Sequence, residues 1–295
     1  MRVLITGVAG MLGATLVDKW KNKFEVYGTD KSNFKKYCPV KFMQFDLFNN
    51  SYNALLEWAK PKVIIHCGAI TNVDYCEDHP KQAMAVNSES VNKILESALD
   101  ARLIFISSEA VFPDGLLNAK EQDNTGPENS YGRSKLAGEK FIQDAGKMHV
   151  AVRTTIVGKN INPASKGFLE WIVESVNSGN EITLFHDAIF NPITIWHFAD
   201  ELEWIIRNEI SEIVHVAGIE PISKYEFGVK ICNQLGLDTS IIRKGSIEDI
   251  DFKAKRNKDQ TLDSTYYQRL SGRILPSADN TIASIVKYFK EYAYA

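Results

Sequence analysis

The sequence is poor in the features that mark several large classes of protein. Its four cysteines, at 38, 67, 76 and 232, match no zinc or redox spacing, so reduced thiols in a cytoplasmic protein are expected. Its six histidines show no metal-ligand spacing, and no metal site is expected. No apolar run approaches the roughly 20 residues of a membrane-spanning helix. A strand pattern begins at once after Met1, so no signal peptide is expected.

The sequence also lacks a large excess of charge of either sign. Its 34 basic and 37 acidic residues give a net charge of −3, so neither nucleic acid nor a membrane surface is expected as a partner. The remaining composition, 44% hydrophobic over 295 residues, is that of a globular protein large enough to bury a core without disulfides.

Short β-rich runs alternate with helical patterns over the first 155 residues. Strands are predicted at Val3–Thr6, Glu25–Gly28, Lys41–Phe45, Val63–His66, Leu103–Ser107 and Val150–Arg153. Helices are predicted at Met11–Trp20, Pro80–Leu99 and Tyr131–Asp144. Several of these strands are continuously apolar, which is typical of strands covered on both faces. The alternation predicts an α/β fold with a Rossmann-type, doubly wound parallel sheet.

The second half of the sequence is less regular. One helix is predicted between a cap at Ser165 and Gly179, and another between the capping box of Ser223 with Glu226 and Gly236. We expect an NAD(P)-binding domain over residues 1–155, completed by about 191–218. A smaller, mostly C-terminal α/β substrate-binding region is expected over 156–190 and 219–295, with a cleft between the two parts.

A glycine-rich loop, Thr6-Gly7-Val8-Ala9-Gly10-Met11-Leu12-Gly13, joins the first predicted strand to the first helix. One glycine makes a tight turn, one lets the backbone approach a diphosphate, and one lets helix and strand pack closely. The free N–H groups at the helix start then favour the anion. In this strand–helix context the loop predicts a dinucleotide site, with contacts from Gly7, Ala9, Gly10, Met11, Leu12 and Gly13.

Asp30 follows Gly7 by about the 20 residues that such a site requires. Its carboxylate can accept hydrogen bonds from the ribose hydroxyls and would repel a 2′-phosphate, which slightly favours NAD(H) over NADP(H). Lys31 beside it can instead attract the phosphate, so both cofactors stay open. Asp46, followed by Leu47, is expected near the adenine, although it can equally cap the next turn.

A Tyr-x-x-x-Lys pair on a helix places a hydroxyl and an ammonium on one face. The sequence contains three such pairs where about one is expected by chance, so the motif alone says little. Tyr131 and Lys135 differ from the others because they begin a good helix and follow a strand that ends in Ser107-Ser108. Ligands bind beyond the carboxyl ends of parallel strands, so Ser108 and Tyr131 should converge there. Lys135 is expected to lower the pKa of Tyr131, which would make Tyr131 a usable general acid.

These motifs, taken in order, resemble the extended short-chain dehydrogenase/reductase superfamily. Within it the chain is most similar to the dTDP-4-dehydrorhamnose reductases. The similarity rests on His66-Cys67-Gly68-Ala69-Ile70-Thr71-Asn72-Val73-Asp74 with Glu77, Val86-Asn87, Phe105–Phe112 and Arg256-Asn257-Lys258-Asp259-x-x-Leu262. The chain departs from the family at Ser108-Glu109, where Thr-Asp is usual, at Cys67-Gly68, where Asn-Ala is usual, and from Phe168 to Pro192.

The resemblance implies NAD(P)H-dependent reduction of a nucleotide-activated 4-keto-6-deoxy sugar, in the synthesis of deoxysugar and polysaccharide precursors. Tyr131 would protonate the carbonyl oxygen, Lys135 would hold the nicotinamide ribose, and Ser108 would orient the carbonyl. Further cofactor contacts are expected from Cys67, Gly68, Ala69 and Ser107. Substrate contacts are expected from Thr71, Val73, Asp74, Ser108, Glu109, Asn191 and Arg256. For Arg256, an ordinary ion pair is an equal alternative to a phosphate contact.

Two other functions stay open. The first is a sugar-nucleotide epimerase or dehydratase with tightly bound NAD, because Glu109 adjoins Ser108. The second is a non-catalytic regulatory subunit of the methionine adenosyltransferase type, since fold alone does not determine function. The intact Ser108, Tyr131 and Lys135 weigh against the second. The resemblance also allows a homodimer, although no interface is identified.

Overall fold

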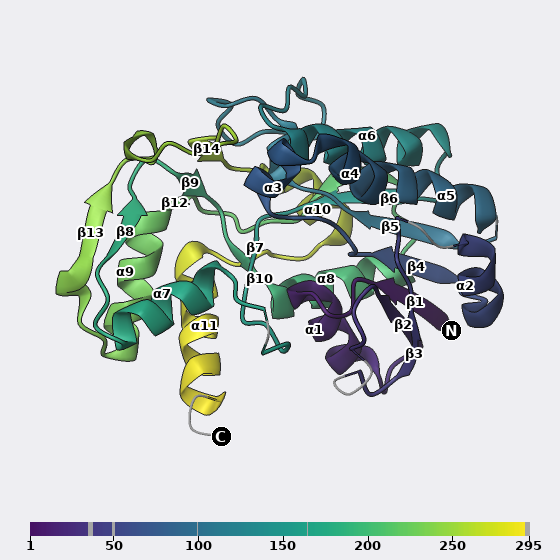
Figure 1. The fold of residues 1–295 in the computed structure, drawn as a ribbon, viewed down its shortest axis with the longest axis horizontal. Coiled ribbons are helices and arrows are strands. Elements are labelled where there is room, and N and C mark those ends of the chain that lie inside the picture. The colour runs from purple at the N-terminus through teal and green to yellow at the C-terminus, as the bar shows by residue number, and fades with distance from the viewer. Residues whose placement is uncertain (35–37, 49–50, 99, 164, 293–295) are drawn as a thin grey trace.

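A parallel seven-stranded sheet forms the centre of the computed structural model, which describes residues 1–34, 38–48, 51–98, 100–163 and 165–292 (Figure 1). Its strands, in spatial order, are β11 (Glu212–His215), β6 (Val150–Arg153), β5 (Arg102–Ile106), β4 (Val63–His66), β1 (Arg2–Thr6), β2 (Glu25–Asp30) and β3 (Lys41–Gln44). All pairings between these strands are parallel. The strand order reverses between β1 and β4, which confirms the predicted doubly wound sheet.

Both faces of the sheet are covered by helices, because successive side chains of each strand point to opposite sides. On β1, Val3 and Ile5 face one layer and Leu4 faces the other. The first layer consists of α1 (Met11–Trp20) and α8 (Ile195–Arg207). The second consists of α2 (Tyr52–Ala59), α5 (Ser90–Ser97) and α6 (Ser130–Asp144). Covering on both sides explains why the strands are continuously apolar.

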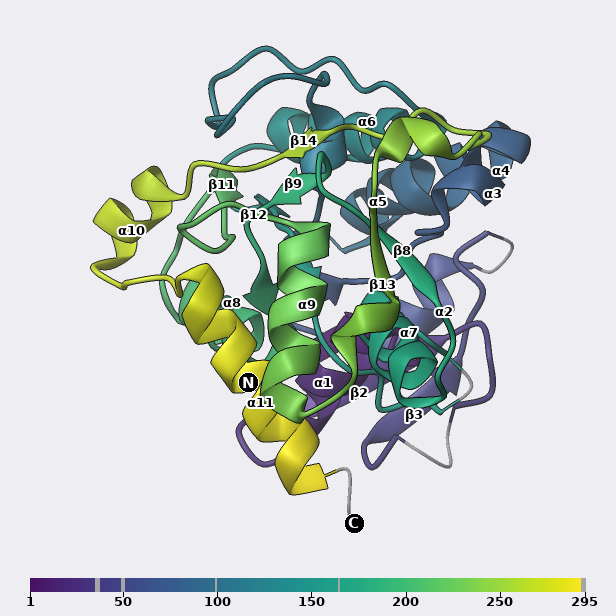
Figure 2. The ribbon, with the colours of Figure 1, turned by 90° about the vertical axis from the view of Figure 1, so that its left-hand side faces the viewer.

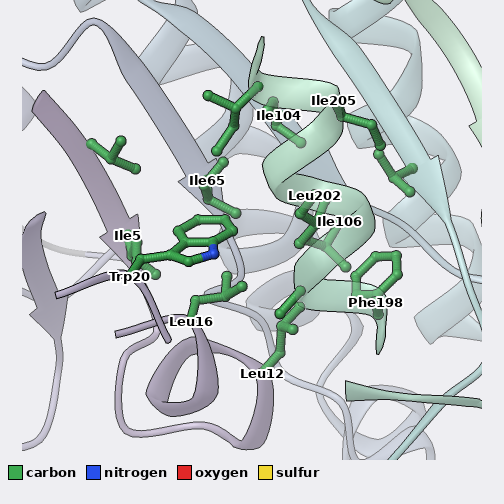
Figure 3. Packing of buried hydrophobic residues seen from close by; sticks show 14 of the residues in the cluster. Ile5, Leu12, Leu16, Trp20, Ile65, Ile104, Ile106, Phe198, Leu202 and Ile205 are labelled. Atoms are coloured by element: carbon green, nitrogen blue, oxygen red, sulfur yellow. The ribbon is translucent and has the colours of Figure 1, made fainter. Parts of the chain in front are cut away.

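Figure 3 shows the first of these layers, where side chains of α1 and α8 meet over the sheet. Leu16 and Trp20 of α1 and Leu202 of α8 are fully buried against Ile5 and its neighbours. Each such side chain contributes about 1.5–3 kcal/mol by leaving water. This layer holds α1, and with it the glycine-rich loop, against the sheet.

The predicted helix Pro80–Leu99 is interrupted in the structure, and its last residue, Leu99, lies outside the described residues. After α3 (Val73–Asp78), the chain forms α4 (Pro80–Met84), a π-helical turn over Ala85–Glu89, and then α5. The turn contains Asn87, whose buried amide accepts a hydrogen bond from Ile70 N (2.7 Å) and donates one to Ser134 Oγ (3.0 Å). These tertiary hydrogen bonds explain the break in a sequence that otherwise reads as one helix.

Apart from α8, β11 and α10 (Thr265–Ser271), which belong with the central sheet, the described residues of the second half form three α-helices and several short strands. Its helices are α7 (Phe168–Asn177), α9 (Lys224–Leu235) and α11 (Ala278–Tyr292). The strands form three small sheets: β7 (Ile156–Val157) with β10 (Ile193–Thr194), β8 (Ile182–Phe185) with β13 (Ile242–Gly245), and β9 (Ile189–Phe190) between β12 (Ile222–Ser223) and β14 (Asp259–Gln260). Figures 1 and 2 both show α9 and α11 side by side, and their apolar faces share one cluster.

The structure confirms the predicted boundaries of α9 in the second half, but α7 begins at a different residue from the one predicted. The capping box of Ser223 with Glu226 and the left-handed Gly236 (φ 75°) delimit α9 as predicted. Helix α7 begins after Gly167 rather than after Ser165. The reason is Glu170, whose carboxylate accepts the Gly167 N–H at 3.0 Å and so caps the helix from inside its first turn.

One further helix, α10 (Thr265–Ser271), returns to the sheet half, the part of the molecule formed by the central sheet and the helices that cover it. Its Tyr267 is buried in the same cluster as α8 and donates a hydrogen bond to Glu201 at 2.7 Å. None of the helices that the structure describes has both the length and the apolar character needed to cross a bilayer.

Candidate active site

A cavity of about 830 Å³ lies beyond the carboxyl ends of the central strands, at the point where the strand order reverses. Open parallel sheets bind their ligands at this position. The cavity is lined by the glycine-rich loop, by Ser108, Tyr131 and Lys135, and by residues of the second half, whose contribution is called the far end below. The structure therefore brings the predicted cofactor loop and the predicted catalytic residues into one site.

The glycine-rich loop leaves no room for side chains at two of its positions. Gly7 has a φ of 70°, and a Cβ atom there would lie 2.7 Å from the backbone of Gly68. A Cβ atom on Gly13 would lie 2.2 Å from the carbonyl oxygen of Gly7. Gly10 is the extended N-cap residue of α1, so the free N–H groups at the helix start face the cavity end. This cradle fits a dinucleotide diphosphate.

Asp30, at the end of β2, both lines the cavity and anchors the loop. One carboxylate oxygen accepts a hydrogen bond from Ala9 N (3.1 Å), and the other accepts from Ser32 N (2.9 Å) and Ser32 Oγ (2.7 Å). Ala9, which was expected to touch the cofactor, instead directs its N–H at Asp30 and lies outside the cavity lining. Lys31 lines the cavity beside Asp30, and so do the expected cofactor contacts Asp46, Leu47, Cys67, Gly68 and Ala69.

A buried polar chain holds the loop from behind. Thr6 and His66 are paired in register on β1 and β4, and their side chains approach to 2.8 Å. Thr6 Oγ1 also accepts the N–H of Gly68 at 3.0 Å, and His66 Nε2 lies 2.9 Å from Ser90 Oγ. Burial lowers the pKa of His66 to about 3, so the ring is neutral. His66 is thus a buried, hydrogen-bonded core residue.

Helix α6 positions the predicted catalytic pair. Asn129 caps it by accepting the N–H of Gly132 at 2.9 Å. A Cβ atom on Gly132 would lie 2.1 Å from Ala110 O, so glycine is needed for α6 to approach the end of β5 this closely. Tyr131 and Lys135 lie one turn apart on this helix, and both line the cavity.

Ser108 lies next to Tyr131, as the sequence suggested, and also contacts the carboxylate that follows it in the chain. Its hydroxyl donates a hydrogen bond to Glu109 Oε2 at 2.6 Å, and both residues line the cavity. The neighbouring Ser107 donates to Glu139 Oε1 at 2.5 Å, and Glu139 forms a buried ion pair with Arg153 at 2.7 Å. Ser107 also lines the cavity. The end of β5 is therefore held rigidly by hydroxyl–carboxylate contacts, which a motif search does not detect.

The structure does not show the expected lowering of the pKa of Tyr131 by Lys135. Burial and the negative charge of Glu109 raise the pKa of Tyr131, and hydrogen bonding with Ser108 opposes them. Lys135 is 3% exposed and turns its ammonium to Ile106 O, at 2.9 Å. Burial lowers the pKa of Lys135 to about 8. At neutral pH Tyr131 therefore keeps its proton, which is the form that a general acid requires.

The expected substrate contacts fall into two groups. Thr71, Val73, Ser108 and Glu109 line the cavity, and burial raises the pKa of Glu109. Asp74, Asn191 and Arg256 lie outside its lining.

The three outlying residues make contacts within the protein. Arg256 Nη2 pairs with Asp74 at 2.8 Å, which is the ion-pair alternative. Asn191 is buried, and its amide donates to Gly218 O (2.7 Å) and Leu262 O (2.6 Å). Asn191 thus joins two segments of the second half.

Several residues line the cavity without having been expected there, among them Gln82 and Val86 of the sheet half and Phe190, Lys224 and Gln260 of the second half. They come from segments far apart in the sequence and belong to no common motif. Across the described ranges, no three histidine, cysteine, aspartate or glutamate side chains are grouped as metal ligands.

Comparison with known proteins identifies the family of the chain. The sequence matches the family described as RmlD substrate binding domain over residues 1–291. It is 27% identical to the probable low-salt glycan biosynthesis reductase Agl14 of Haloferax volcanii, over 99% of this chain and 100% of that protein. It is 26% identical to methionine adenosyltransferase 2 subunit beta of Bos taurus, over 82% of this chain and 74% of that protein.

Among solved structures, dTDP-4-dehydrorhamnose reductase from Bacillus anthracis in complex with NADP superimposes with a TM-score of 0.87 at 25% identity, covering 97% of this chain and 99% of that one. Because the family match extends over nearly the whole sequence, the chain belongs to the RmlD substrate binding domain family.

Proposed function

We propose that this member of the RmlD substrate binding domain family is an NAD(P)H-dependent oxidoreductase that reduces the 4-keto group of a nucleotide-activated 6-deoxy sugar. One observation carries the proposal: Ser108, Tyr131 and Lys135 line the same cavity as the glycine-rich loop. The similarity to a glycan biosynthesis reductase and to a dTDP-4-dehydrorhamnose reductase supports it.

The chemistry that a bound reduced nicotinamide supplies is hydride transfer to the carbonyl carbon. Tyr131 donates its phenolic proton to the carbonyl oxygen, and Ser108 orients that oxygen. Lys135, whose ammonium donates to Ile106 O at 2.9 Å, would hold the nicotinamide ribose and supply positive charge to the cavity. The glycine-rich loop binds the diphosphate of the cofactor through its N–H groups.

For the cofactor we favour NADH over NADPH. The Asp30 carboxylate is fixed by Ala9 and Ser32 at the adenosine end of the cavity, where it can accept hydrogen bonds from ribose hydroxyls. A 2′-phosphate would meet this negative charge. The positive charge of Lys31, which also lines the cavity, would offset part of this repulsion if NADPH bound.

Glu109 supports a second candidate, an epimerase or dehydratase that retains its cofactor. The Glu109 carboxyl lines the cavity, accepts a hydrogen bond from Ser108, and has a pKa raised by burial. Such an enzyme would return the hydride to its product and consume no added cofactor.

The deciding measurement is the loss of absorbance of NADH and of NADPH with a small panel of nucleotide-linked 4-keto-6-deoxy sugars. Consumption that disappears in Tyr131→Phe is the expected result. Tight cofactor binding without consumption of either cofactor would contradict the reductase and leave the epimerase or dehydratase.

A further inference from the structure

Lys224 occupies a fixed position at the far end of the cavity. It is the first residue of α9, directly after the N-cap Ser223, whose hydroxyl accepts the N–H of Glu226 at 3.0 Å. The backbone N–H of Lys224 donates to Ala188 O at 2.9 Å. Its ammonium lies 5.7 Å from the centre of the Phe168 ring, within the range of a cation–π contact. Both residues line the cavity.

Three lysines line the cavity within the described part of the chain: Lys31, Lys135 and Lys224. Lys31 stands at the adenosine end beside Asp30, and Lys135 donates to Ile106 O. Lys224 alone of the three comes from the second half. Among the described residues, none accepts a hydrogen bond from its ammonium. An ammonium has three donors, so these are available to a ligand.

Lys224 has one charged neighbour of each sign, Glu109 and Arg256. Burial and the positive charge of Arg256 lower the pKa of Lys224, while the negative charge of Glu109 raises it. Arg256 Nη2 is paired with Asp74, but its buried Nη1 has no hydrogen-bond partner among the described atoms. Two neighbouring cations therefore have donor groups that the described protein atoms leave unused.

We propose that the Lys224 ammonium binds the diphosphate of the nucleotide sugar, with Arg256 adding positive charge behind it. This inference rests on the proposed function, which requires a substrate carrying a nucleoside diphosphate. The carbonyl must reach Ser108 and Tyr131, and Lys224 interacts electrostatically with Glu109, the residue next to Ser108. A sugar ring lying between Tyr131 and Lys224 places its carbonyl at one group and its diphosphate at the other.

The test is calorimetric titration of the NADH-saturated protein with dTDP and UDP, comparing wild type with Lys224→Met at low and high salt. Loss of a hydrogen bond to a charged group predicts at least about tenfold weaker binding of the nucleoside diphosphate at low salt. Near 1 M salt, where charges are screened over about 3 Å, the difference should shrink. Lys224→Arg should retain most of the affinity.

Lys230→Met is the matched control, because Lys230 lies on the same helix but is exposed and paired with Asp279 at 2.7 Å. It should bind nucleoside diphosphates like wild type. Unchanged affinity in Lys224→Met would overturn the role of Lys224 and leave the proposed function intact. A loss that is the same at both salt concentrations would assign Lys224 to packing against Phe168 and also overturn it. If the wild-type protein bound neither diphosphate, both the inference and the proposed function would fail.

Discussion

The sheet half and the second half of the molecule differ in how far apart along the chain the residues of one functional unit lie. The glycine-rich loop occupies eight consecutive residues, from the last residue of β1 into the start of α1, and Tyr131 and Lys135 share one helix turn. The far end of the cavity instead joins Phe168, Lys224 and Gln260, which belong to three separate elements. Cofactor binding is thus encoded in local motifs, and substrate binding in tertiary contacts. Substitutions in the two halves test this contrast.

The largest effect is expected in the sheet half, at Tyr131. Replacing Tyr131 by Phe removes the proton donor and should lower kcat by about two to four orders of magnitude. NADH affinity, measured by fluorescence titration, should change little, because the diphosphate is held by the glycine-rich loop. A steady-state kcat of Tyr131→Phe close to that of wild type would exclude Tyr131 as the general acid.

A smaller effect on folding and cofactor binding is expected at Gly13. An added Cβ atom would lie 2.2 Å from Gly7 O, so Gly13→Ala should cost about 1–3 kcal/mol of unfolding free energy and weaken NADH binding. In the second half, Gly179→Ala is the matched control: Gly179 has a φ of 73° but open space around it. It should cost about 1–2 kcal/mol and leave NADH affinity intact. Urea unfolding measures the free energy of unfolding of each variant, and titration measures its NADH affinity. Equal NADH affinity in the two variants would contradict the role of Gly13 in the cofactor cradle.

Cofactor choice should change at Asp30. Asp30→Asn removes the charge and keeps one acceptor oxygen, enough for either Ala9 or Ser32, so the ratio of kcat/KM for NADPH to that for NADH should rise about tenfold. Asp46→Asn, at another point of the same cavity, should change this ratio less. An unaltered ratio in Asp30→Asn would remove the argument for NADH.

The smallest effect is a pH dependence. Burial lowers the pKa of Lys135 to about 8, so its ammonium form predominates below pH 8 and is lost above it. Because kcat/KM for NADH reports groups of the free enzyme, it should fall about fourfold between pH 7 and pH 8.5. Lys135→Arg retains its charge over this range and should lack the decline, whatever its absolute rate. A flat wild-type profile up to pH 9 would argue against a required Lys135 ammonium.

The sequence predicted most of the sheet half because its patterns are local. Continuous apolar strands, the glycine spacing and the start of α6 each require only neighbouring residues. The errors in this half occurred where a distant group intervened. Asn87 breaks a helix by bonding to Ile70 and Ser134, and Lys135 turns to Ile106 O instead of lowering the pKa of Tyr131.

The second half was predicted less well, since its strands are two to four residues long and pair with distant segments. Local capping at Ser223 was still found correctly. Asn191 and Arg256 were assigned to the substrate from the resemblance alone, and the structure places both outside the cavity lining. Lys224, which does line the cavity, carries no motif.

The sequence by itself determined the doubly wound sheet, the cofactor loop and the helix that bears Tyr131 and Lys135, because periodicity and short-range spacing specify these features. Only the tertiary structure decided which groups the catalytic residues contact, and which charges meet across the far end of the cavity. The physical reason is that hydrogen bonding, burial and charge act through space. A carboxylate next in sequence can accept the hydrogen bond of Ser108, and a lysine 93 residues from Tyr131 can line the same cavity.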